Sequence, residues 1–88
     1  TEGEFINREL ILLKVSANSE NRSDLLQITK IFGAKVIDVS HEMLIVEYAD
    51  TYDQVRRLEQ MLERYGIRET VRTGTIAIEN AHVMAGNK

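Results

Sequence analysis

Few side chains in this sequence have the types and spacing that chemistry requires. The two histidines, His41 and His82, lie far apart without a ligand-like spacing, so we expect neither to bind a metal. The chain contains no Cys, which excludes a thiolate nucleophile, a zinc knuckle and a disulfide framework. It also lacks the motifs of nucleophile elbows, phosphate-binding loops and dinucleotide-binding folds. The sequence therefore predicts a protein without a catalytic centre.

The most polar connection, "SANSENR" (16–22), offers a second candidate site. Asn18, Asn21 and Arg22 could imitate the groups that handle phosphate in enzymes of the acylphosphatase type, but the rest of that signature is absent. Base stacking as in RNA-recognition domains is not expected, because the central strands carry aliphatic rather than aromatic residues. The net charge is −3 and the pI about 5.3, so no basic surface is available for nucleic acid or an anionic membrane.

Length and composition describe one small domain. The chain has 88 residues, of which 43% are apolar, enough to form a core. No apolar run approaches the roughly 20 residues of a membrane span, and no signal peptide is visible. The absence of Cys fits a reducing compartment, and we expect a cytoplasmic protein.

An internal repeat at an offset of 33 residues predicts the fold. Segment 9–17 falls on 42–50, and segment 22–33 falls on 55–66, so each half reads strand, helix, Gly, strand. Ankyrin and tetratricopeptide arrays have similar periods but need more copies and mainly helices. Joined at 40–42, the halves predict an α+β, ferredoxin-like βαββαβ sandwich of the ACT-like kind. Its four-stranded antiparallel sheet should have the strand order 4-1-3-2, with both helices on one face.

Local signals agree with this division into elements. Gly33 and Gly66 stand where a helix ends in a left-handed residue. We do not expect them to cradle phosphate, because phosphate loops precede helices and these glycines follow them. A T-x-x-Q capping box begins at Thr51, and Asn21 or Ser19 is expected to cap the first helix.

The helices show apolar stripes that should face the core. Ile31 and Leu26 widen the stripe of the first helix, which is therefore either deeply packed or shared with a partner. The expected core residues of the first helix are Leu25, Ile28 and Phe32, and those of the second are Val55, Leu58, Met61, Leu62 and Tyr65.

The two central strands carry apolar residues on both faces. One face meets the helices, and the other should be polar if it meets only water. A patch of apolar residues on adjacent strands usually meets a partner, so we predict a homodimer contact or a contact with another domain here. The predicted interface residues are Leu10, Leu12, Met43 and Ile45, flanked by Lys14 and Glu47.

Three segments together resemble one known family. They are "NRELILLKVSA" (7–17), "IFGAKVIDVS" (31–40) and "YGIRETVRTGTIAIE" (65–79), and they are similar to the C-terminal domain of the acetolactate synthase small regulatory subunit. The resemblance divides the chain into an N-terminal extension (1–6), the ferredoxin-like domain (7–79) and a C-terminal tail (80–88). The family usually follows R-T-G with an apolar stretch that ends in Arg-Gly, where this chain has Glu79-Asn80 and then a different tail. Family members also carry an N-terminal ACT domain, which this sequence does not contain.

The resemblance implies a regulatory, non-catalytic domain. Such a domain would support assembly, activation and feedback control of the catalytic large subunit in branched-chain amino acid biosynthesis. Thiamine diphosphate, Mg²⁺ and FAD would belong to that large subunit, and this chain would bind no cofactor. The valine site would belong to the missing ACT domain. Whether this half-subunit is a fragment or a separate gene product stays open.

The alternative is a free-standing ACT-like sensor that binds a small molecule. Such modules bind amino acids at the turn between the first strand and first helix, often beside a Gly that lets the ligand approach the backbone. The turn "SANSENR" contains no Gly, which argues against the alternative.

Overall fold

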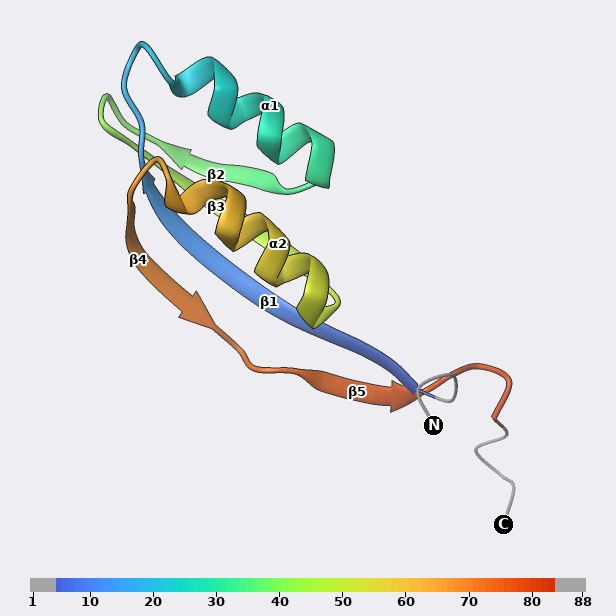
Figure 1. Ribbon diagram of the computed structural model, residues 1–88. Coiled ribbons are helices and arrows are strands. Elements are labelled where there is room, and N and C mark those ends of the chain that lie inside the picture. The colour runs from blue at the N-terminus through green and yellow to red at the C-terminus, as the bar shows by residue number, and fades with distance from the viewer. Residues whose placement is uncertain (1–4, 84–88) are drawn as a thin grey trace.

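The computed structural model describes residues 5–83. Two helices pack on one face of an antiparallel sheet whose strands follow the order β2-β3-β1-β4 (Figure 1). This arrangement confirms the predicted ferredoxin-like α+β fold and its strand order. The elements are β1 (Phe5–Ser16), α1 (Arg22–Phe32), β2 (Lys35–Val39), β3 (Met43–Asp50), α2 (Tyr52–Glu63), β4 (Ile67–Arg72) and β5 (Ile76–Glu79).

The fifth strand departs from the predicted four-stranded sheet. The repeat predicts a single strand after Gly66, whereas the structure has two, β4 and β5. β5 pairs with the first residues of β1, and β1 itself begins at Phe5, inside the segment expected as an N-terminal extension. The two strands form a ribbon that projects beyond the helices (Figure 1). The predicted tail is described only as far as Val83.

Helix boundaries confirm most of the local signals. The Thr51 hydroxyl accepts a hydrogen bond from the Gln54 amide at 3.3 Å, as the capping box requires. Gly33 and Gly66 have φ values of 77° and 96°, the left-handed conformation predicted for them.

The cap of α1 differs from the prediction. Asn21 occupies the N-cap position, but its side chain makes no capping bond and accepts instead from the Asn18 amide at 2.8 Å. The Asn18 side chain in turn accepts from the amides of Glu20 and Asn21. These reciprocal bonds close the polar loop on itself, and Ser19 takes no part in them.

The core lies between the helices and the sheet. Tyr48 completes it with an edge-on contact to Phe32, whose ring centroid is 6.0 Å away. Met61 was predicted to join the core but is 47% exposed, because it lies at the border of the stripe that Val55, Leu58 and Leu62 bury. The fully buried side chains are Ile11, Leu13, Val15, Leu25, Leu44, Val46, Val55, Leu58 and Leu62.

The widened stripe of α1 is not deeply packed. Leu26 is 42% exposed and Ile31 is 81% exposed, whereas Ile28 and Phe32 pack against the core. The structure thus removes one of the two explanations offered for this stripe, and sharing with a partner stays a prediction.

Candidate functional site: the open sheet face and its projecting ribbon

The face of the sheet opposite the helices carries the predicted interface residues. Side chains alternate along β1, so Ile11, Leu13 and Val15 enter the core while Leu10 and Leu12 point away from it. No helix of the described residues covers this side (Figure 1).

Strand register places the remaining residues of this face. Leu12 pairs with Val71 of β4, and residues paired in this way share a face. Met43 and Ile45 alternate with the buried Leu44 and Val46, so they share the same outer face. The open face is therefore defined as Leu10, Leu12, Met43, Ile45 and Val71, of which the sequence had indicated all but Val71.

A shallow hollow lies in the middle of the open face. Leu12, Ile45 and Val71 line it, and Lys14 and Glu69 form its charged border. The Lys14 Nζ lies 3.3 Å from a Glu69 carboxylate oxygen, so these two charges neutralise each other. The hollow can receive an apolar side chain but offers no group for acid–base chemistry.

The ribbon of β1 and β5 extends the apolar surface and is here called the arm (residues 5–8 with 76–79). Within it Ile6 pairs with Ile78, and Arg8 pairs with Ile76. All three isoleucines are exposed: Ile6 by 44%, Ile76 by 68% and Ile78 by 71%. The arm was not predicted, although a Gly within a strand pattern signals a bulge and could have revealed it.

A one-residue bulge at Gly74 sets the direction of these isoleucines. The Thr73 amide donates to the Leu10 carbonyl at 3.1 Å, and the Leu10 amide donates to the Thr73 hydroxyl at 3.1 Å. Arg8 pairs with Ile76, so two steps on β1 from Leu10 to Arg8 oppose three on the other strand from Thr73 to Ile76. Gly74 accommodates the extra residue with φ of 81°. A register shift of one residue moves every following side chain of a strand to the opposite face of the sheet. The bulge therefore places Ile76 and Ile78 on the same face as Ile6 and Leu10.

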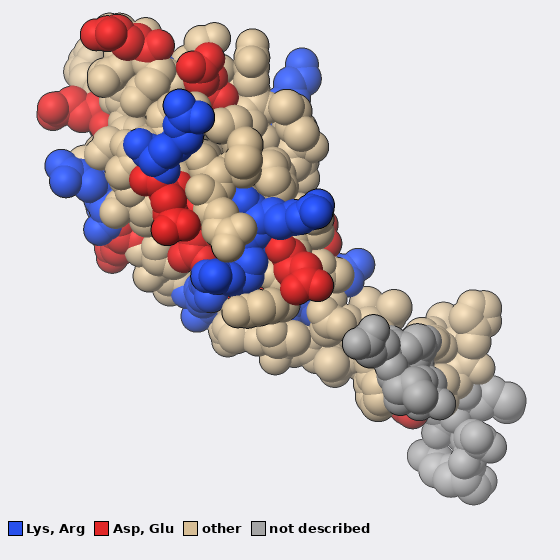
Figure 2. All heavy atoms as spheres, viewed as in Figure 1, with Lys and Arg blue, Asp and Glu red and all other residues tan. Residues whose placement is uncertain are grey.

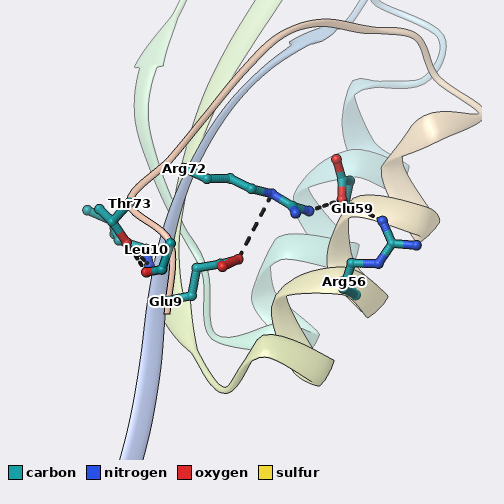
Figure 3. Close-up of polar contacts among 7 residues, drawn as sticks. Glu9, Leu10, Arg56, Glu59, Arg72 and Thr73 are labelled. Carbon is teal, nitrogen blue, oxygen red and sulfur yellow. Dashed lines mark hydrogen bonds and ion pairs between the residues drawn. The ribbon is translucent and has the colours of Figure 1, made fainter. Parts of the chain in front are cut away.

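An ionic network on the helical side fastens the root of the arm (Figure 3). Arg72 of β4 pairs with Glu59 of α2, and its Nε lies 4.0 Å from the Glu9 carboxylate of β1. Arg56 approaches Glu59 at 3.3 Å. Glu9 is only 3% exposed, and its Oε2 accepts no hydrogen bond. Arg72 is therefore the compensating charge for a buried carboxylate and joins three elements.

The residues that could imitate a phosphate-binding site make structural contacts instead. The Arg22 guanidinium donates to the backbone carbonyls of Ser40 and His41 at 2.6 and 3.0 Å, which fixes the β2–β3 hairpin against α1. His41 and His82 are both exposed and lie in separate parts of the fold. Within residues 5–83, no group of His, Cys, Asp and Glu could hold a metal ion.

One titrating group is shifted. Burial raises the pKa of the Tyr48 phenol, and its hydrogen bond to Asp50 at 3.1 Å adds to the effect. Tyr48 therefore remains protonated at neutral pH and serves the core. Among the described helices, none has the length and apolar character to cross a membrane.

The order and packing of these elements define a class of fold: a small ferredoxin-like α+β domain of the ACT-like kind. Comparison with known proteins specifies the family. The sequence model of the family described as the small subunit of acetolactate synthase matches residues 8–81. The chain belongs to this family. This confirms the resemblance seen in the sequence.

Individual relatives agree with this assignment. A probable acetolactate synthase small subunit of Archaeoglobus fulgidus is 36% identical over 83 residues, covering 94% of this chain and 49% of the relative. The small subunit of Mycolicibacterium smegmatis is 38% identical over 77 residues, covering 88% and 45%. The crystal structure of the Thermotoga maritima small subunit superposes with a TM-score of 0.85 at 31% identity, covering 91% of this chain and 49% of that one. The chain spans about half the length of these relatives.

Proposed function

We propose that this chain is a regulatory, non-catalytic domain that supports assembly, activation and feedback control of the acetolactate synthase large subunit. The observation that carries the proposal is the family match across residues 8–81. The pathway is branched-chain amino acid biosynthesis, and the setting is the cytoplasm. Thiamine diphosphate, Mg²⁺ and FAD are assigned to the large subunit.

The most direct test measures binding and activity together. Purified large subunit from the same organism is mixed with this chain, and acetolactate formation is compared with and without it. We expect the two chains to co-purify and the activity per large subunit to rise. If neither effect is seen at a saturating concentration of this chain, the proposal is contradicted.

The open face is proposed to bind a second copy of this chain. Its residues are already half-buried within the sheet, so complete burial adds about 1 kcal/mol each, roughly half the value for a fully exposed side chain. A two-fold contact uses each residue twice, because one patch serves both partners. Together they offset much of the association cost of about 4–15 kcal/mol.

Two substitutions test this contact. Leu12→Glu with Ile45→Glu places carboxylates in the middle of the open face, away from the core residues Leu13 and Val46. The double variant should keep its circular dichroism spectrum but sediment as a monomer. Gln60→Glu is a matched control, because it adds negative charge to an exposed position of α2. Equal dimerisation of both variants would contradict the assignment of the interface.

The sensor alternative is tested by calorimetry with valine, leucine and isoleucine. The loop at 16–22 contains no Gly, and the Asn18 and Asn21 side chains bond to its own amides. We therefore expect no saturable binding by this chain. Binding in the micromolar range would favour a sensor.

A further inference from the structure

The arm is exposed and apolar, and no element of residues 5–83 covers it. The molecule measures 57 × 21 × 19 Å along its principal axes, and the arm projects from its narrow end (Figure 1). Figure 2 shows many charged side chains over the helical side and few on the visible part of the arm. A two-stranded ribbon alone is at best marginally stable in water, so this one needs a surface to pack on.

The arm and the open face form one continuous surface. Ile6, Arg8, Leu10 and Leu12 occupy alternate positions of β1 and therefore share one side. The bulge at Gly74 adds Ile76 and Ile78 to that same side. A partner that covers the open face therefore also meets the isoleucines of the arm.

We propose that the arm of one copy lies across the open face of a second copy, and vice versa. The proposal rests on the self-association proposed above and specifies its geometry. The two-fold axis of this dimer passes between the two stacked sheets, beside Leu10 and perpendicular to β1. The strands of the two copies therefore run in opposite directions. Arg8 then lies over Leu12 of the second copy, and Ile76 lies over Val71 of the second copy. By the same registers Ile6 and Ile78 lie over the border of the hollow, above the Lys14–Glu69 ion pair of the second copy.

Charge complementarity favours this orientation over one in which the two arms pack against each other. Arg8 is exposed and Glu47 is partly exposed, and neither forms an ion pair with another residue of 5–83. Glu47 pairs across the strands with Leu12, so reversed stacking brings Arg8 close to Glu47 of the second copy. If the two arms instead packed together, Arg8 would approach Arg8 of the second copy, and like charges repel.

A pair of variants on one strand tests the apolar contact. Ile78→Asp should weaken the dimer at least tenfold in sedimentation equilibrium. Ala77→Asp, on the opposite side of β5, is exposed and should change the dissociation constant by less than threefold. Circular dichroism verifies that both variants are folded. Equal effects of the two variants would overturn the arm contact while leaving the open-face dimer intact.

A charge exchange tests the polar contact. Arg8→Glu and Glu47→Arg should each raise the dissociation constant of the dimer. The variant that combines both should recover at least half of that change, measured on the logarithm of the dissociation constant. Additive losses in the double variant would refute the proposed pairing of these charges.

Disulfide trapping tests the orientation directly. The chain has no Cys, so single introduced cysteines are unique. A mixture of Ile76→Cys and Val71→Cys chains should oxidise mainly to the mixed dimer. Predominant cross-linking of Ile76→Cys chains with themselves would show that the arms pack together and would overturn the proposal. A monomeric wild-type chain would overturn both the arm contact and the self-association, whereas large-subunit binding is measured separately.

Discussion

Replacing Arg72 with methionine leaves a buried carboxylate without its compensating charge. Glu9 is 3% exposed and the Arg72 side chain is 29% exposed, with 4.0 Å between Nε and Oε2. Removing one partner of a buried pair costs about 3–5 kcal/mol, and the partial exposure of Arg72 reduces this to about 2–4 kcal/mol. The loss is large beside the roughly 4–13 kcal/mol expected for a domain of this size.

Urea unfolding followed by circular dichroism measures the effect. With a slope of about 1 kcal/mol/M, the midpoint should fall by about 2 M or more. Arg68→Met is the matched control, because Arg68 is an exposed residue of the same strand and should change stability by less than about 0.5 kcal/mol. The double variant Glu9→Gln with Arg72→Met should recover part of the loss, because position 9 then no longer carries a buried charge. If Arg72→Met costs as little as Arg68→Met, the compensating role assigned to Arg72 is wrong.

Four further substitutions test other parts of the structure by the same unfolding measurement. Leu58→Ala should cost about 2–5 kcal/mol because the side chain is fully buried, whereas Met61→Ala should cost less than about 0.5 kcal/mol; similar costs would contradict the packing of α2. Thr51→Ala should cost about 0.5–2 kcal/mol by removing the cap of α2, and no change would exclude that role. Gly74→Ala should cost about 1–2 kcal/mol through its left-handed backbone alone, because nothing lies within 4 Å of the added methyl; a neutral result would mean that the bulge is not required.

The repeated pattern made the fold predictable. Apolar alternation on β1 and β3 and the glycines at 33 and 66 are local signals, and the two halves supported each other. The same alternation placed Leu10, Leu12, Met43 and Ile45 on one face, as the register confirms. Their role in binding stays a prediction.

Features that depend on contacts between distant elements were missed. The arm depends on the pairing of β5 with the first residues of β1, which no local pattern announces, although Gly74 signals the bulge between β4 and β5. The network of Glu9, Glu59 and Arg72 joins three elements, so no local spacing announces it. Met61 was misplaced because an apolar stripe on a helix does not show how much of its width is buried.

Sedimentation equilibrium of the wild-type chain tests the proposed interface most directly. Apolar burial by the open face and the arm should produce a dimer at concentrations well below ~100 μM, because a dissociation constant of ~1 μM corresponds to about −8 kcal/mol. A two-fold increase in mass across that range is the predicted result. A chain that remains monomeric at ~100 μM would contradict the claim that its uncovered sheet face binds a second copy.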